Sequence, residues 1–176
     1  VTFGKLTVTN AQDVKVTSQD SLAVIGAVEI SCDGEVEITS GESYAVTNNV
    51  TVKRASKVAI SGKSDTNHIV TGDVTIACPV PVTIQNKGTG GMANSINYSG
   101  GKYVYSDTEN GPRVDPSSTP INAEANAVYI TPVVARTITL TNATVDVPDN
   151  KAYAGQTVTV TPDDRTAEGY QFVRWE

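Results

Sequence analysis

The sequence has few of the residues that usually mark a catalytic, metal-binding or disulfide-stabilised protein. Its 176 residues include one histidine, two cysteines and one tryptophan, and aromatic residues make up only 6%. Two cysteines are too few for a disulfide framework or a cysteine-rich zinc site. No apolar run approaches the length that a membrane-spanning helix needs. We therefore expect no cofactor, no structural metal and no membrane span.

Positive charge is also scarce. The chain carries 13 Lys and Arg residues against 19 Asp and Glu residues, which gives a net charge of −6. The basic residues are scattered along the sequence, whereas a nucleic-acid partner requires a clustered basic face. The composition therefore predicts that nucleic acid is not a partner.

What the sequence does contain is a repeat of about 22 residues. Four consecutive units, 6–27, 28–49, 50–73 and 74–95, are 22, 22, 24 and 22 residues long. The first, third, ninth and eleventh positions of every unit are aliphatic: Leu6, Val8, Val14 and Val16; Val28, Ile30, Val36 and Ile38; Val50, Val52, Val58 and Ile60; Val74, Ile76, Val82 and Ile84. The residues between them are mostly polar or small, so each unit contains two short strands with one buried face.

Two further columns repeat in each unit. A looser third strand places Leu22 and Val24, Tyr44 and Val46, and His68 and Val70 at equivalent positions, once a two-residue insertion in the third unit is allowed for. Gly26, Asn48, Gly72 and Asn94 come just before the next unit. Glycine and asparagine adopt a left-handed backbone most easily, so this column predicts a recurrent tight corner.

Three strands and three turns in each 22-residue unit are typical of a parallel β-helix. One coil cannot bury its aliphatic residues alone, whereas stacked coils cover one another. Ile96 and Tyr98 begin a fifth coil on schedule. We predict an all-β fold, a parallel, right-handed β-helix of about five short coils over residues 1–105. A β-sandwich also uses short strands, but it gives no reason for aliphatic positions matched at this period.

The repeat ends after residue 105. Residues 106–127 are rich in proline and small polar residues, which predicts a linker or a draped loop. Strand character returns at 128–135, and we expect residues 128–176 to form a small, incomplete β module.

The last part of the chain carries a family resemblance. A strand, the turn Ala-Tyr-Ala-Gly-Gln, the alternating strand 157–161 ended by Pro162, and a final aromatic motif with Tyr170, Phe172 and Trp175 follow one another. This order resembles the divergent B-repeat of internalin-like and other bacterial cell-surface proteins. Such repeats usually continue with further strands after the aromatic motif, so we expect the module to be either cut short or completed by something else. The resemblance implies an extracellular chain, secreted or attached to the cell wall, and no particular ligand. The first 105 residues are similar in a general way to β-helical adhesins and carbohydrate-binding proteins.

Tyr98, Tyr103 and Tyr105 form the main aromatic cluster outside the tail. Sugars bind flat aromatic faces flanked by polar groups, so these tyrosines are the candidate glycan-binding residues, with a polysaccharide or host glycan as partner. The alternative is a cap, because the last coil of a β-helix must cover its open end with bulky residues.

Other reactive residues give weaker signals. No nucleophile accompanies His68 in the sequence, so we expect a histidine of the wall or the loop edge. Cys32 and Cys78 fall two coils apart, too far for a disulfide, which predicts free thiols. Glu29 and Glu37 lie on different strands and have no calcium-binding spacing, so a solvated face is favoured over a metal site.

We therefore expect a non-catalytic extracellular surface module that acts as a structural spacer or adhesion domain. A glycan-binding module on a β-helix scaffold is the alternative. A polysaccharide lyase is less favoured because such enzymes need paired carboxylates or a base beside calcium-bound uronate.

Overall fold

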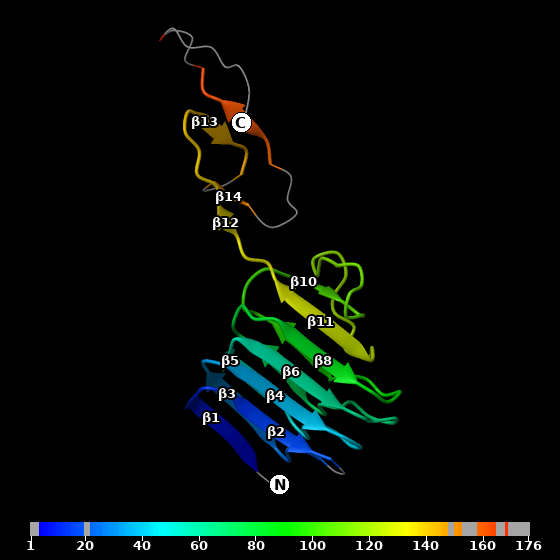
Figure 1. Cartoon of the computed structure of the whole chain (residues 1–176). Helices are drawn as coiled ribbons and strands as arrows, with labels where there is room; N and C mark the ends of the chain where they lie inside the picture. Colours follow the sequence, from blue (N-terminus) through cyan, green and yellow to red (C-terminus); the bar gives the residue numbers. More distant parts are fainter. Residues whose placement is uncertain (1–3, 20–21, 148–149, 153–157, 165–167, 169–176) are drawn as a thin grey trace. The chain divides into compact units, whose positions relative to one another are not determined.

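The structure is a computed structural model of the chain, and it describes residues 4–19, 22–147, 150–152, 158–164 and 168. The chain divides into two compact units, Val1–Pro132 and Val133–Glu176. The elements of both units are β-strands, as the sequence predicts (Figure 1). In the part of the chain that is described, no helix is long and apolar enough to cross a membrane.

The first unit is a solenoid with two parallel sheets. One sheet contains β1 (Lys5–Ala11), β3 (Ala27–Cys32), β5 (Val50–Arg54), β7 (Asp73–Ile76) and β9 (Ser95–Tyr98) in that order. The other stacks β2 (Val14–Ser18), β4 (Glu35–Ser40), β6 (Lys57–Gly62) and β8 (Val82–Asn86). Parallel bridges from Val24 to Val46 and from Val46 to Val70 form the third side. Each repeat unit is therefore one coil, and the predicted parallel β-helix is confirmed.

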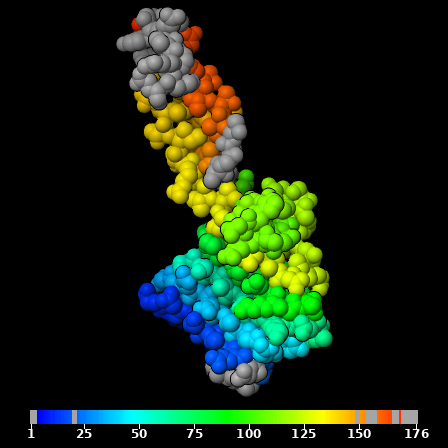
Figure 2. Space-filling view, turned by 45° about the vertical axis from the view of Figure 1, so that its right-hand side comes forward, coloured from blue at the N-terminus to red at the C-terminus, as the bar shows by residue number. Residues whose placement is uncertain are grey.

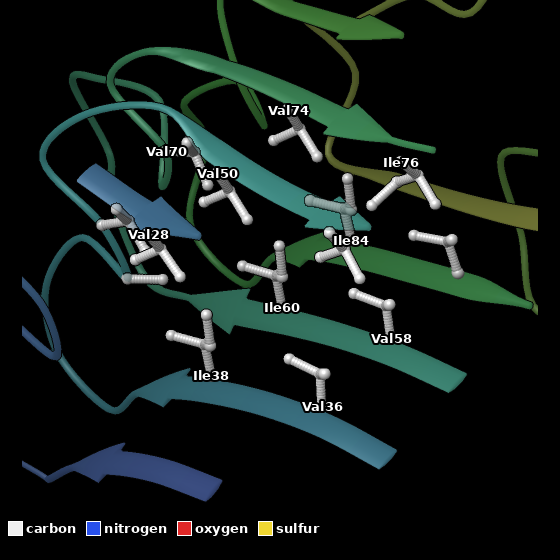
Figure 3. Packing of buried hydrophobic residues seen from close by; sticks show 14 of the residues in the cluster. Val28, Val36, Ile38, Val50, Val58, Ile60, Val70, Val74, Ile76 and Ile84 are labelled. Atoms are coloured by element: carbon white, nitrogen blue, oxygen red, sulfur yellow. The ribbon is translucent and has the colours of Figure 1, made fainter. Parts of the chain in front are cut away.

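The strand register is the one that the repeat predicts. Val28 pairs with Val50, and Ile30 with Val52, in parallel orientation. The matched aliphatic side chains point inward from the facing sheets and form one continuous core (Figure 3). All of them are buried except three in the first coil, Leu6, Val8 and Val16, which pack against the core but remain partly exposed.

Ion pairs connect neighbouring coils on the outer faces. Lys15 and Glu37 lie opposite each other on adjacent strands, and their charged groups are 2.9 Å apart. Glu29 accepts from Lys5 at 3.0 Å and also binds Lys53, so it joins three coils. These pairs are solvent-exposed, and surface pairs of this kind add little to stability.

The Gly/Asn column forms corners, but not in the uniform left-handed conformation that we expected. Among its four members only Gly26 has a positive φ, of 106°. Gly72 is required by a close approach instead, because a Cβ there would lie 2.2 Å from Oδ1 of Asn49. Asn48 accepts a hydrogen bond from the next main-chain N–H (2.7 Å), and Asn94 donates one to a carbonyl oxygen of the preceding coil (3.0 Å). The four members of the column therefore form the same corner with different backbone conformations and contacts.

The fifth coil is incomplete. Strand β9 stacks on β7, but β10 (Tyr103–Ser106) does not stack on β8. Strand β11 (Ala127–Pro132) takes that place in antiparallel orientation, with Val128 opposite Ile84 and Ile130 opposite Val82, and β10 pairs with its outer edge. The solenoid therefore has four complete coils.

This arrangement moves the domain boundary. Residues 128–132 were expected to begin the second module, and they form β11 of the first unit instead. The physical reason is that Val128 and Ile130 alternate inward and complete the core at the end of the solenoid.

The segment between β10 and β11 is a draped loop, one of the two predicted alternatives. Its residues Val114, Ile121 and Ala125 pack against the solenoid core. Figure 2 shows the segment, coloured green to yellow, on the surface of the first unit. The carbonyl oxygen of Ala123 accepts the main-chain N–H of Met92 at 2.8 Å, which continues the third side of the solenoid. The segment thus covers the last coil.

The second unit contains two short antiparallel pairs. Strand β12 (Arg136–Thr137) pairs with β14 (Lys151–Ala152), and β13 (Ala143–Val145) pairs with β15 (Val160–Pro162). The β15 strand ends at Pro162, as the sequence predicts, but residues 158 and 159 of the predicted strand lie outside it. Tyr170, Phe172 and Trp175 lie outside the described residues.

The inward and outward positions are tested by one pair of substitutions. Ile60→Asp should lower the free energy of unfolding by roughly 4 kcal/mol or more, because it places an unpaired carboxylate in a dry core. Thr83→Asp, at a half-buried outward position of the neighbouring strand, should change it by less than about 1 kcal/mol. Urea unfolding followed by circular dichroism measures both, and equal losses would contradict the assignment of faces.

Candidate functional site

The most irregular surface of the solenoid lies where the repeat is interrupted. Up to Ser61 the third coil keeps the 22-residue period, since Ser61 pairs with Thr39, but Val70 bridges to Val46, 24 residues earlier. The two extra residues are therefore in the loop that joins the second strand to the third side. We call residues 63–68 the inserted loop.

Shorter loops of the adjacent coils flank the inserted loop, and a hollow lies on each side of it. The first hollow, of about 320 Å³, is lined by Glu42, Ser43, Tyr44, Lys63, Ser64, Asp65 and Thr66. The second, also of about 320 Å³, is lined by Asp65, Thr66, Asn67, His68, Thr89, Gly90, Gly91 and Glu124. Asp65 and Thr66 belong to both. The two hollows and the inserted loop together are the polar corner.

Asn86, at the end of β8, holds the inserted loop in place. Its side chain is 3% exposed, and its Oδ1 accepts the main-chain N–H groups of Ser64 and Gly88, each at 2.9 Å. Its Nδ2 donates to the carbonyl oxygens of Ser64 (2.8 Å), Gly90 (2.6 Å) and Gly91 (3.1 Å). One buried amide thus satisfies the main chain of two loops that depart from regular strand pairing.

The loops on either side of the polar corner approach each other closely. A Cβ on Gly88 would lie 2.4 Å from the carbonyl oxygen of Ser64, and one on Gly90 would lie 2.2 Å from that of Asn67. Asp65 accepts the main-chain N–H of Thr89 at 3.1 Å. The inserted loop is therefore tied to the fourth coil by main-chain contacts that require glycine.

Side chains of the inserted loop also reach toward the second coil. Nδ2 of Asn67 donates to the Tyr44 hydroxyl at 2.9 Å. Nζ of Lys63 pairs with Glu42 at 2.8 Å, and hydrogen bonding to Glu42 raises the pKa of this lysine. Asp65, Thr66 and Asn67 themselves are exposed, so their polar groups are accessible from solvent.

His68 lies at the edge of a loop, as expected, and both ring nitrogens have partners. Nδ1 is 3.0 Å from Oδ1 of Asn94, and Nε2 is 3.0 Å from a carboxylate oxygen of Glu124. Through Glu124 the histidine ties the draped loop to the solenoid wall. Both ring nitrogens are thus occupied by side-chain oxygens of Asn94 and Glu124, and both cysteine thiols are buried.

Sugar binding requires exposed aromatic rings, and the three tyrosines predicted to bind glycan are largely covered by the protein. Tyr98 and Tyr105 are only 6% and 3% exposed, and Tyr103 is half-buried with its ring centroid 4.7 Å from that of Tyr98. The Tyr98 hydroxyl donates to the carbonyl oxygen of Val80 at 3.1 Å, and burial raises its pKa to about 12. Because Tyr98 and Tyr105 are buried and Tyr103 is half-buried, these tyrosines cover the end of the solenoid, which was the alternative to a glycan platform.

The structure also places the two cysteines and the two glutamates that the sequence analysis considered. Cys32 and Cys78 are free and buried, and burial raises the pKa of both thiols, so the reactive thiolate is disfavoured. Hydrogen bonds from Lys53 and Lys5 lower the pKa of Glu29 to about 2, and one from Lys15 lowers that of Glu37. Within the described ranges, no three His, Cys, Asp or Glu side chains are placed to hold a metal ion.

The sequence contained one signal for the polar corner, the two-residue insertion in the third unit. Asp65, Thr66 and Asn67 lie in or beside that insertion, so the change in period marks them. Asn86 and Glu124 carry no such signal, because their roles depend on contacts that the repeat does not specify.

Comparisons of the chain with protein-family models, with curated proteins and with solved structures found no match.

The role of Asn86 predicts a large effect of a small substitution. Asn86→Ala should lower the free energy of unfolding by about 2–3 kcal/mol, because it leaves buried main-chain groups of the inserted loop unsatisfied. Asn110→Ala, at an exposed asparagine of the draped loop, is the matched control and should change it by less than about 0.5 kcal/mol. Chemical denaturation measures both, and similar small losses would show that Asn86 does not hold the corner.

The cap formed by the tyrosines is tested through Tyr105, whose hydroxyl donates to the carbonyl oxygens of Thr119 (2.9 Å) and Pro120 (3.1 Å). Tyr105→Ala should cost about 3–5 kcal/mol, as expected for removing a buried ring. Tyr129→Ala, on the outward face of β11, should cost clearly less. If thermal unfolding shows no difference between the two variants, Tyr105 is not part of a cap.

Proposed function

We propose that this protein is a non-catalytic extracellular module that acts as a rigid spacer and adhesion domain at a bacterial surface. The observation that carries the proposal is the continuous core of stacked coils, closed at its end by β11 and the draped loop. Each coil is hydrogen-bonded to the next by parallel strands, so the length of the unit depends directly on the number of coils.

The chemistry of the reactive residues supports a non-catalytic role. His68 is engaged at both ring nitrogens, and the two thiols are buried. The extracellular location is supported by the resemblance of the tail to bacterial surface repeats. An acidic chain without a basic cluster is also suited to an exposed, soluble surface.

Glycan binding is the second candidate function, and the polar corner favours it. Its two hollows combine hydroxyl, amide and carboxylate groups with a ring side chain in each, Tyr44 in the first and His68 in the second. Such a lining suits a hydrated, hydroxyl-rich ligand better than an apolar one.

The location is tested by antibody labelling of the cells that produce the protein. We expect the antibody to label intact cells or to detect the protein in the medium. Labelling that requires permeabilised cells, with none in the medium, would contradict the proposal. A cytoplasmic marker protein serves as the control for cell integrity.

The spacer role predicts that one coil can be removed without loss of the fold. Deleting residues 28–49 joins the first coil to the third in register and should shorten the solenoid by about 4.8 Å. Spin labels at Thr17→Cys and Lys87→Cys, both exposed, report this change as a narrow distance distribution in the full-length and shortened chains. Deleting residues 39–49 breaks the register and is the control, which should not fold. A broad distribution in the full-length chain would contradict a rigid spacer.

A further inference from the structure

The polar corner has the chemistry of a carbohydrate site, and we infer that it binds an uncharged, linear oligosaccharide. This inference rests on glycan binding, the second candidate function above. The chain of sugars would cross the inserted loop along the solenoid axis and contact both hollows, with Asp65 at the centre.

The arrangement of the two hollows points to an extended ligand. Both are lined by Asp65 and Thr66, and they open on opposite sides of the inserted loop, one toward the second coil and one toward the fourth. Successive coils are about 4.8 Å apart, so a ligand that fills both hollows must extend over several coils. A linear oligosaccharide has this shape, whereas a single sugar would fill only one hollow.

The polar groups suit the hydroxyls of a sugar. Asp65 uses one carboxylate oxygen to accept the Thr89 N–H, and its carboxylate retains further acceptor capacity. Hydrogen bonds from hydroxyls to a carboxylate are stronger than those to neutral oxygens. Tyr44 and His68, at equivalent positions of successive coils, are both half-buried, and each lines one of the hollows.

The charge of the polar corner excludes anionic glycans. Asp65 and Glu124 both line the second hollow, and the only lysine of the first, Lys63, is paired with Glu42. A uronate or a sulfated sugar would place like charges close together, which is unfavourable. The ligand is therefore an uncharged oligosaccharide rather than a polyuronate.

The repeat offers a matched variant for the test. Deleting Asp65 and Thr66 restores the 22-residue period of the third coil and removes the residues that both hollows share. The strands on either side keep their register, because the insertion lies between Ser61 and Val70. This variant should lose the hollows and retain the solenoid.

The experiment measures retention of the full chain on immobilised cellohexaose, mannohexaose and maltohexaose. Hexagalacturonate is the anionic comparison and a glucosamine hexamer the cationic one. We expect retention by at least one uncharged hexamer, and loss of at least tenfold in affinity on deletion of Asp65 and Thr66. Thr66→Lys should have a similar effect, and Asp65→Asn should weaken binding about tenfold because it removes the charged acceptor. Thr17→Lys, at an exposed threonine of β2, should leave binding unchanged.

Three outcomes would overturn the inference. They are retention on none of the uncharged hexamers, retention only on a charged one, and retention that the deletion and Thr66→Lys leave unchanged. If the deletion variant does not fold, the inference is tested by Thr66→Lys and Asp65→Asn, because neither substitution removes main-chain atoms. The spacer proposal is tested separately by cell labelling and by coil deletion, so it can hold even if no sugar binds.

Discussion

The structure depends on in-register stacking of the aliphatic columns. A single coil is too thin to enclose its own apolar side chains, so each coil is stable only when the next one covers it. The two ends of the solenoid show the consequence. In the first coil Leu6, Val8 and Val16 remain partly exposed, whereas at the other end β11 and the draped loop supply the missing cover. Strand β11 pairs with β8 in antiparallel orientation and covers the apolar side chains of the last coil, as a further coil would.

The need for in-register stacking also determines where residues can be inserted in the chain. A one-residue insertion in a strand would move the following side chains to the other face, and a two-residue insertion would shift their pairing with the next coil, so the strands keep their register. The two extra residues of the third coil lie in a corner, where they extend outward and leave the register of β6 and β8 intact. The cost is a loop whose main-chain groups have no strand partners, and the buried Asn86 side chain satisfies two of them, the N–H and the carbonyl oxygen of Ser64. The polar corner is thus a local exception that the core tolerates.

The sequence predicts the parts of the fold that recur. The period fixed the parallel pairing of Val28 with Val50 and the inward direction of the core residues, because every coil repeats the same information. Strand β11 occurs once, and its pairing with β8 depends on the apolar edge that the fourth coil leaves open. The burial of Tyr105 likewise depends on Thr119 and Pro120, which no repeat connects to it. For the polar corner, the insertion gave its position but not the contacts of Asn86 and Glu124.

Function in a solenoid of this kind is expected at the breaks in the repeat. The outward positions of the strands are mostly threonine or paired charges such as Lys15 and Glu37, whose groups already bind one another across coils. A ligand at those positions would have to compete with these existing pairs. At the inserted loop, by contrast, Asp65, Thr66 and Asn67 project from the wall and are exposed on a backbone fixed by buried hydrogen bonds. A rigid support for exposed polar groups lowers the entropy lost on binding, which is the physical reason to look for recognition at this corner.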